Sequence, residues 1–286
     1  MSSTFTKKRL DLTISLSAGQ FGNAGNTVTL TGLRMTADLL SPAGDAMGEL
    51  RLRVFGLPQA IMNQLTIIGQ INRVNPQNTI LLSAGDDVSG MQMVFKGTIN
   101  TVWADYNSAP EVSLNVVAFM GMDALIKPVG ASSFQGATDV ATIMEGFSKV
   151  MGLVFENNGV AVTLSNPYFP GTALSQVRSC AQAADIWYAI DRGVLAIWPK
   201  TGARKGEIPM ISPETGMVGY PSLNSGGMSV QTLFNWNIRP GGQVRVESSI
   251  PMANGLFTLG PYSHSLSSEM PDGPWFTILE CYRVGN

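Results

Sequence analysis

Residues 9–16 read RLDLTISL, and the apolar side chains of Leu10, Leu12, Ile14 and Leu16 alternate there with polar or charged ones. In an extended chain, successive side chains point to opposite faces. A period of two therefore predicts a β-strand with one buried face and one face in water.

The same alternation continues through the first third of the chain. It returns at residues 50–54 and 112–116, and breaks rich in Gly, Pro or Asp occur at 41–44 and 84–90. Short alternating stretches separated by such breaks predict an antiparallel barrel or sandwich. We assign residues 1–126 to an N-terminal, tube-like β-barrel domain.

One short helix is expected to interrupt these strands. Pro58 suits a first helical position, because its missing N–H would have no partner there. Ile61, Met62 and Leu65 share one helical face, and Gly69 can end the helix.

The period changes from two to that of a helix in residues 127–200, which we assign to a central α+β module of two helices and two hairpins. Residues 139–151 predict one helix, capped by Thr138 or Asp139 and ended by Gly152, and residues 173–184 predict a second. Turns at 157–159 and 191–193 predict one hairpin after each helix.

Alternation resumes after residues 199–211, which we interpret as a polar linker holding Lys200, Arg204 and Lys205. Short strands are expected near residues 228–230, 244–246 and 257–259, so residues 201–286 form a C-terminal β-barrel domain. The predicted fold class is mainly β (α+β), with two small antiparallel barrels joined by the central module.

Composition excludes several classes of protein. Charged residues are 13% of the chain and the formal net charge is −2, so there is no strong field to attract nucleic acid or an anionic membrane. Cys180 and Cys281 lie too far apart for a zinc ribbon or a thioredoxin-type motif, and we expect buried free thiols. We expect neither a signal peptide nor a membrane-spanning segment, which indicates synthesis in a cytoplasm.

Catalytic patterns are absent from the sequence. His264 is the single histidine, and no nucleophile elbow, zinc-protease motif or nucleotide-binding loop accompanies it, so we expect a hydrogen-bonded barrel histidine. Asp86 and Asp87 are interpreted as turn formers, because Val88 breaks calcium-loop spacing. The prediction is no enzyme, with no catalytic, cofactor-binding or metal-binding residue and no cofactor.

Basic and aromatic clusters also have ordinary explanations. Residues 7–9 and 204–205 could imitate a nucleic-acid groove together with Trp187 and Trp198, but we interpret them as solvated strand ends. Trp187, Tyr188 and Trp198 are expected to pack on the preceding helix as core. The polar positions of the strands are mostly uncharged, which favours subunit contacts and hence a component of an assembly.

The order of these pieces resembles that of baseplate hub proteins of tailed bacteriophages. The resemblance covers most of the chain and lies in scattered apolar and turn positions. It is carried by residues 27–38, 94–106, 139–151, 166–171, 173–198, 211–220, 232–235, 241–246, 262–264 and 275–277.

The resemblance implies a homotrimer in a virion tail baseplate, assembled in the host cytoplasm. Two barrels per subunit would give six around a pore, which would match a hexameric tail tube or tube initiator on one side and a trimeric central spike on the other. Other baseplate and tape-measure proteins would be neighbours, and DNA would pass through without specific contacts. The chain has no room for a lytic module or an additional domain, so we expect spike and lysis to come from other proteins.

Three alternatives remain open at this stage. A tube-initiating or tail-completion ring would have sixfold symmetry. A tail-associated peptidoglycan hydrolase would need carboxylates that only folding brings together, and a carbohydrate-binding module would need exposed Trp side chains.

Overall fold

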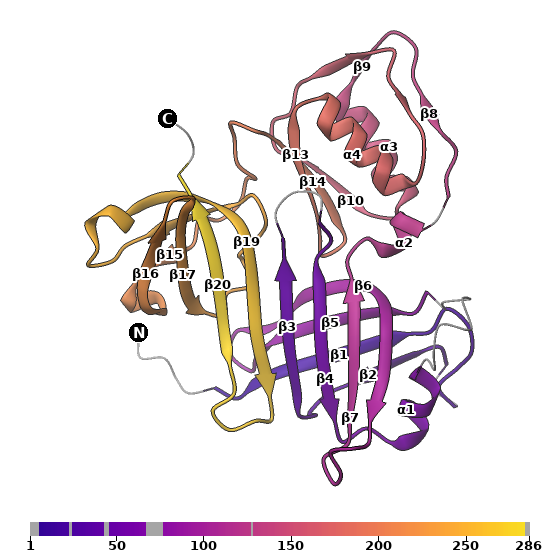
Figure 1. Ribbon diagram of the computed structural model, residues 1–286, viewed down its shortest axis with the longest axis vertical. Coiled ribbons are helices and arrows are strands. Elements are labelled where there is room, and N and C mark those ends of the chain that lie inside the picture. Colours follow the sequence, from indigo (N-terminus) through magenta and orange to yellow (C-terminus); the bar gives the residue numbers. More distant parts are fainter. Residues whose placement is uncertain (1–5, 23–24, 43–45, 67–76, 127, 284–286) are drawn as a thin grey trace. The chain divides into compact units, whose positions relative to one another are not determined.

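The computed structural model describes residues 6–22, 25–42, 46–66, 77–126 and 128–283, and the protein is mainly β (Figure 1). The chain divides into two compact units. Unit 1 contains the described residues of 1–40, 49–120 and 264–276, and unit 2 contains those of 41–48, 121–263 and 277–286.

Unit 1 is built from antiparallel strands in which alternate side chains are buried. In β1, Leu10, Leu12 and Ile14 are each 1% exposed or less, which confirms the strand predicted from the opening alternation. The strands wholly within unit 1 are β1 (Lys8–Ser15), β2 (Thr27–Leu30), β4 (Glu49–Phe55), β5 (Thr79–Asp86), β6 (Gly90–Asp105) and β7 (Ser113–Phe119), together with β3 (Met35–Ser41) except for its last residue.

The short helix is α1 (Gln59–Leu65), and it buries Met62 and Leu65 as predicted. Pro58 is the N-cap residue and not the first helical residue, because its ψ of 137° is extended. The helix therefore begins at Gln59. The helix ends at Thr66, whose N–H donates to the Met62 carbonyl. The expected stop at Gly69 lies outside the described residues.

Unit 2 begins with helices that cover one side of a small sheet, and both predicted helices are confirmed. Asp139 caps α3 by accepting a hydrogen bond from the Thr142 N–H, and Thr172 caps α4 in the same way. This part contains α2 (Met122–Ile126), β8 (Ser132–Ser133), β9 (Ala137–Asp139), α3 (Val140–Val150), β10 (Val154–Asn157), β11 (Thr163–Ser165), β12 (Tyr168–Phe169), α4 (Ala173–Ala183), β13 (Ile186–Asp191) and β14 (Val194–Pro199).

One of the two predicted hairpins is confirmed. β13 and β14 pair antiparallel across residues 191–193, where Arg192 and Gly193 have the positive φ angles that a tight hairpin turn needs.

The hairpin predicted at residues 157–159 is wrong, although the chain does turn there. β10 pairs parallel with β14, and β11 pairs with β9. The Asn157 Oδ1 atom accepts from the backbone N–H groups of Gly159 and Val160 and closes a side-chain turn, while β14 supplies the hydrogen-bonding partner for β10.

The remaining strands form the second β-rich part of unit 2. Their buried face includes Val230, Val244, Val246 and Leu279, each 1% exposed or less, which confirms the strands predicted near 228–230 and 244–246. The elements are β15 (Met210–Ile211), η1 (Pro213–Thr215), β16 (Met217–Asn224), β17 (Gly227–Leu233), β18 (Gln243–Val246), η2 (Pro251–Ala253), β19 (Gly255–Ser268) and β20 (Trp275–Tyr282).

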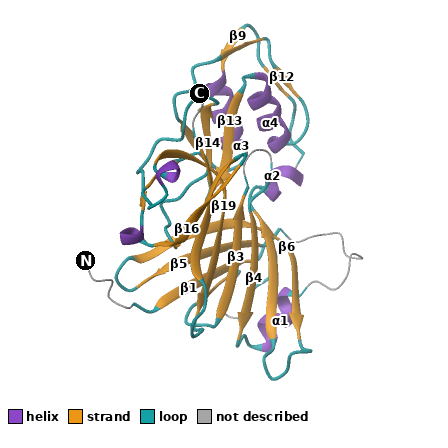
Figure 2. Cartoon of the chain, turned by 60° about the vertical axis from the view of Figure 1, so that its left-hand side comes forward, coloured by secondary structure: helices purple, strands orange, loops and turns teal. Residues whose placement is uncertain are grey.

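Within the described residues, thirteen strands are connected in one large, mainly antiparallel sheet (Figure 2). Its main path runs β16-β17-β20-β19-β3-β4-β7-β6-β5-β1-β2, and β18 pairs with β19 and, in parallel, with β15. β19 and β20 contribute to both units, because residues 264–276 belong to unit 1 and the rest of these strands to unit 2.

Candidate functional site

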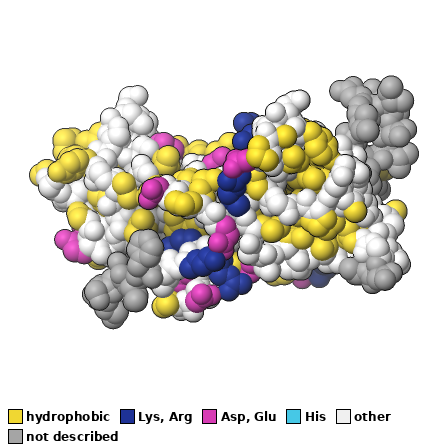
Figure 3. Space-filling view, turned by 90° about the horizontal axis from the view of Figure 1, so that it is seen from below, with side chains coloured by type: hydrophobic (Ala, Val, Ile, Leu, Met, Phe, Trp, Pro, Cys, Tyr) yellow, Lys and Arg dark blue, Asp and Glu magenta, His cyan; other side chains and the backbone are white. Residues whose placement is uncertain are grey.

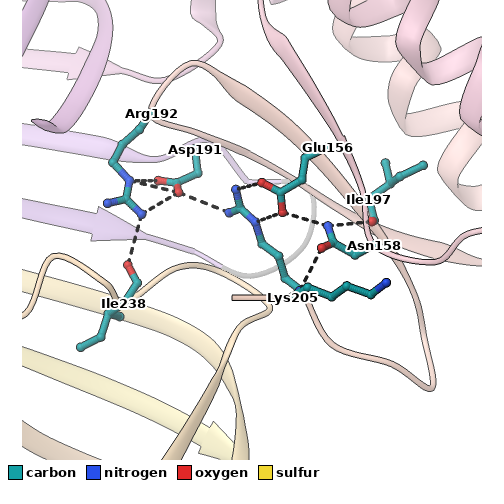
Figure 4. Close-up of polar contacts among 8 residues, drawn as sticks. Glu156, Asn158, Asp191, Arg192, Ile197, Lys205 and Ile238 are labelled. Carbon is teal, nitrogen blue, oxygen red and sulfur yellow. Dashed lines mark hydrogen bonds and ion pairs between the residues drawn. The ribbon is translucent and has the colours of Figure 1, made fainter. Parts of the chain in front are cut away.

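The segment after β14 carries a buried arginine at the centre of an ion-pair network in unit 2. Arg204 is 4% exposed. Its Nε and Nη2 atoms donate to the two carboxylate oxygens of Glu156 at 2.8 and 2.9 Å, and its Nη1 atom lies 3.4 Å from Asp191 Oδ2 (Figure 4). The paired contact to Glu156 fixes the guanidinium in one orientation.

Arg192 extends this network from the hairpin turn. It donates to both carboxylate oxygens of Asp191 at 3.1 to 3.2 Å, to the Trp236 carbonyl at 2.8 Å and to the Ile238 carbonyl at 3.4 Å. Asp191 is therefore shared between two guanidinium groups. The β13–β14 turn is held to the backbone that precedes β18.

Asn158 completes the network on the side of β10. It is 6% exposed, its Nδ2 atom donates to Glu156 and to the Ile197 carbonyl, and its Oδ1 atom accepts from the Lys205 N–H (Figure 4). These bonds tie the 157–159 turn to β14 and to the segment after it. The tie is a tertiary contact that local turn chemistry could not reveal.

The interpretation of residues 204–205 as a solvated basic pair is wrong for Arg204 and right for Lys205, which is exposed. Arg204 is buried because Glu156 and Asp191, 48 and 13 positions earlier in the chain, face the same point. Neither acid is close enough to Arg204 in the sequence for a local pattern to indicate the contact. The sequence analysis therefore did not predict this network.

The charges of the network reinforce one another. Burial acts to lower the pKa of Arg204, but hydrogen bonding to Glu156 and the charges of Asp191 and Glu156 outweigh it and raise that pKa. The Arg204 guanidinium in turn holds the pKa of Glu156 below its usual range. Both groups stay charged at neutral pH, so the network acts as a fixed clamp and offers no proton to a reaction.

A pocket of about 410 Å³ lies beside this network in unit 2. Trp187, Trp198 and Tyr282 contribute aromatic walls, and Lys200 and Arg283 contribute positive charge. All three aromatic residues expected in the helix-packed core line this pocket: Trp187 is 44% exposed, and Tyr188 and Trp198 are buried. Tyr188 does pack into the core that includes α3 and α4.

The other residues considered from sequence lie in structural positions. His264 is 4% exposed within β19, as expected for a strand histidine. Cys180 and Cys281 are buried free thiols, as predicted, and burial raises the pKa of each to about 12. Among the described residues, no three His, Cys, Asp or Glu side chains are grouped closely enough to hold a metal ion.

The Asp86–Asp87 pair forms a hairpin turn, as predicted. Asp86 accepts from the N–H groups of Val88 and Ser89 and from Lys8. Burial opposes ionisation of Asp86, but these hydrogen bonds outweigh it and hold the pKa of its carboxyl well below the usual range. Asp87 pairs with Arg9 at 2.9 Å on the surface of unit 1, whereas Lys8 pairs with the buried Asp86.

Comparison with known protein families identifies the chain. A sequence model of the family described as baseplate hub gp41 matches residues 10–281. The chain belongs to this family and is a structural component of a bacteriophage tail baseplate. No curated protein matches its sequence.

Solved structures share the fold at low sequence identity. A tail protein from Neisseria meningitidis MC58 matches with a TM-score of 0.60 and 10% identity, covering 94% of this chain and 96% of that one. The 43 kDa tail protein of prophage MuSo2 from Shewanella oneidensis matches with a TM-score of 0.60 and 10% sequence identity, and the match covers 96% of each chain.

A third similar structure comes from a secretion system. The E. coli c3393 protein, described as a component of the type VI secretion system similar to T4 tail proteins gp27 and gp5, gives a TM-score of 0.60 and 10% identity. The match covers 96% of this chain and 77% of that one.

No helix in the described part of the chain is long and apolar enough to cross a bilayer.

Proposed function

We propose that three copies of this protein form a ring that joins the tail tube, or its initiator, to the central spike of a virion. The observation that carries the proposal is the family match over residues 10–281. Each subunit would supply two tube-like barrels, from residues 1–126 and 201–286, with residues 127–200 between them. Six barrels then meet a hexameric tube, while the three subunits meet a trimeric spike.

An exposed apolar face in unit 2 supports self-association. Leu233 of β17 and Ile278 of β20 are 49% and 43% exposed, although their strands bury the alternate side chains. Val218 and Tyr220 are exposed on the neighbouring β16, where Val218 pairs with Gln231 of β17. Apolar side chains free of charge suit a contact between subunits, and we assign this face to the contact between copies.

The scarcity of charge suits a conduit for DNA. In Figure 3, several Lys and Arg side chains lie next to Asp or Glu side chains, and further Asp and Glu side chains lie apart from them. Rings of unpaired Lys and Arg would hold phosphates, because each neutralised phosphate adds salt-sensitive affinity. The ring would let DNA pass during ejection without binding it tightly, and its role would be mechanical, without catalysis.

The stoichiometry of the purified protein tests this proposal. Light scattering should give three times 30.5 kDa at high concentration, and negative-stain class averages should show threefold symmetry. Replacing Leu233 and Ile278 together by Asp should shift the mass toward one subunit. Val154→Asp, at another exposed apolar side chain, is the matched control and should leave the assembly intact.

Two rival functions give different results in simple assays. A strictly sixfold ring would instead identify a tube-initiating or tail-completion protein. A cleared band on a cell-wall zymogram would identify a peptidoglycan hydrolase and would contradict the non-enzymatic role.

A further inference from the structure

The aromatic pocket in unit 2 has walls that require glycine at two positions. A Cβ atom at Gly241 would lie 2.2 Å from the Trp198 ring, and one at Gly260 would lie 2.1 Å from the Tyr282 ring. Both rings therefore lie directly on bare backbone. The walls are formed before any ligand arrives, which lowers the entropic cost of binding.

The accessible surface of the pocket wall is mainly apolar, with a small polar share. Trp187 and Tyr282 are 44% and 40% exposed, so their rings are available to a ligand. Partly exposed aromatic side chains in a preformed hollow are typical of the anchor points of protein contacts. The hollow is large enough to take one or two side chains of a partner.

The charged side chains that line the pocket are both positive. Lys200 and Arg283 line it, and no Asp or Glu is among its described lining residues. The Lys200 Nζ atom lies 5.4 Å from the centre of the Trp187 ring and also pairs with Asp185, which is itself exposed. Arg283 donates to the carbonyl groups of Met252 and Asn254. An occupant with negative charge next to an apolar group would complement this arrangement.

We infer that this pocket binds a short acidic peptide segment with an aromatic or aliphatic anchor side chain, supplied by another protein of the tail. The anchor would lie between Trp187, Trp198 and Tyr282, and the flanking carboxylates would face Lys200 and Arg283. The source of the peptide rests on the proposed hub function, but its chemistry rests on the pocket alone. The scarcity of polar side chains disfavours a sugar, whose hydroxyl groups need several hydrogen-bonding partners.

Binding of matched synthetic peptides to the purified chain tests the inference. The probe is acetyl-Gly-Asp-Phe-Asp-Gly-amide. One control replaces both Asp residues by Lys, and the other replaces Phe by Ala. We expect millimolar or tighter binding of the probe, seen as a change in Trp fluorescence and as NMR shifts, with at least about tenfold weaker binding of either control.

Two variants locate the binding. Trp187→Ala should weaken binding of the probe about tenfold, and Lys200→Ala should weaken it about threefold and reduce its sensitivity to salt. Trp103→Ala is the matched control, because Trp103 is 43% exposed in unit 1, and it should leave binding unchanged. Both alanine changes near the pocket are at partly exposed side chains, and circular dichroism verifies that the variants fold.

Several results would overturn the inference. These are equal binding of the lysine peptide, binding unaffected by Trp187→Ala, no binding at several millimolar, or a preference of the pocket for chitohexaose or a thymidine hexanucleotide. The proposed hub function is tested separately, because light scattering on the same samples reports the oligomeric state whether or not the peptide binds.

Discussion

Two groups of ion pairs stand in opposite environments. In unit 1, Arg9 pairs with Asp87 at the surface, where the two residues keep 38% and 67% of their side-chain surface exposed. In unit 2, the Arg204 side chain is 1% exposed and that of Asp191 is 2% exposed. Water and salt screen the first group, whereas the second has only its own partners to balance its charge.

The difference shows which charges the fold depends on. A surface pair contributes little, because both ions are well solvated apart. Removing one member of a buried pair leaves the other charged without compensation. In the sequence, both groups look like polar residues in loops and at strand ends. Removing a residue from each group should nevertheless change the free energy of unfolding by very different amounts.

Removing Arg204 should produce the largest effect. Arg204→Ala leaves Glu156 and Asp191 without their shared partner and should lower the free energy of unfolding by about 3–5 kcal/mol in urea titrations. Lys205→Ala is the matched control: its side chain is exposed and only its backbone joins the network, so a change within about 0.5 kcal/mol is expected. Similar losses from both variants would refute the clamp.

The backbone beside the clamp should be the next most sensitive point. The Gly241 carbonyl accepts from the Arg204 N–H at 2.7 Å, and its φ of +74° disfavours any side chain. Gly241→Ala also drives a methyl group into the Trp198 ring, so we expect a loss of about 2–3 kcal/mol by thermal unfolding. The control Gly146→Ala, in α3 with open space, should stabilise the protein slightly.

Asp86 should show an intermediate, pH-dependent effect. Its folded-state pKa lies below the unfolded value of about 3.9, so its stabilisation is complete above that pH and is lost as pH falls below it toward the folded pKa. Asp86→Asn should cost about 1–2 kcal/mol at pH 7 and less at pH 3. Urea midpoints measured at both values check this, and a penalty that is constant with pH would contradict it.

Replacing Arg9, whose ion pair with Asp87 is exposed to solvent, should have the smallest effect on stability. Arg9→Ala should leave the unfolding midpoint at 150 mM salt unchanged within error, because solvent replaces the Asp87 contact. A clear drop in the midpoint that persists at 1 M salt would show that the surface group matters as much as the buried one.

Turn chemistry was readable from the sequence, but strand pairing was only partly so. Residues 157–159 and 191–193 carry similar turn residues, and the chain turns at both. At 191–193 the flanking strands pair with each other, whereas β10 finds its partner 40 residues away in β14. A turn signal reports backbone conformation over three or four residues and contains no information on which strand lies next to it.

The helices and the buried alternation of the strands were predictable, because their apolar periods and caps are local. The candidate sites were not. Arg204 and its acids meet only through the fold, and the pocket depends on Gly241 and Gly260 lying under aromatic rings from other segments. The exposure of Trp187 could not be predicted, because apolar residues occupy both faces of its strand and the sequence does not show which face is buried.

The passage of β19 through both units has a consequence for how the protein is made. Ser265 donates to Asp38, and Ser268 donates to the Leu33 carbonyl, so the N-terminal unit takes contacts from the last tenth of the chain. A ribosome delivers that stretch only near the end of translation. Because β3 lies between β4 and β19 in the sheet, a nascent chain stalled before residue 264 would expose β3 as an unpaired edge to its neighbours on the polysome.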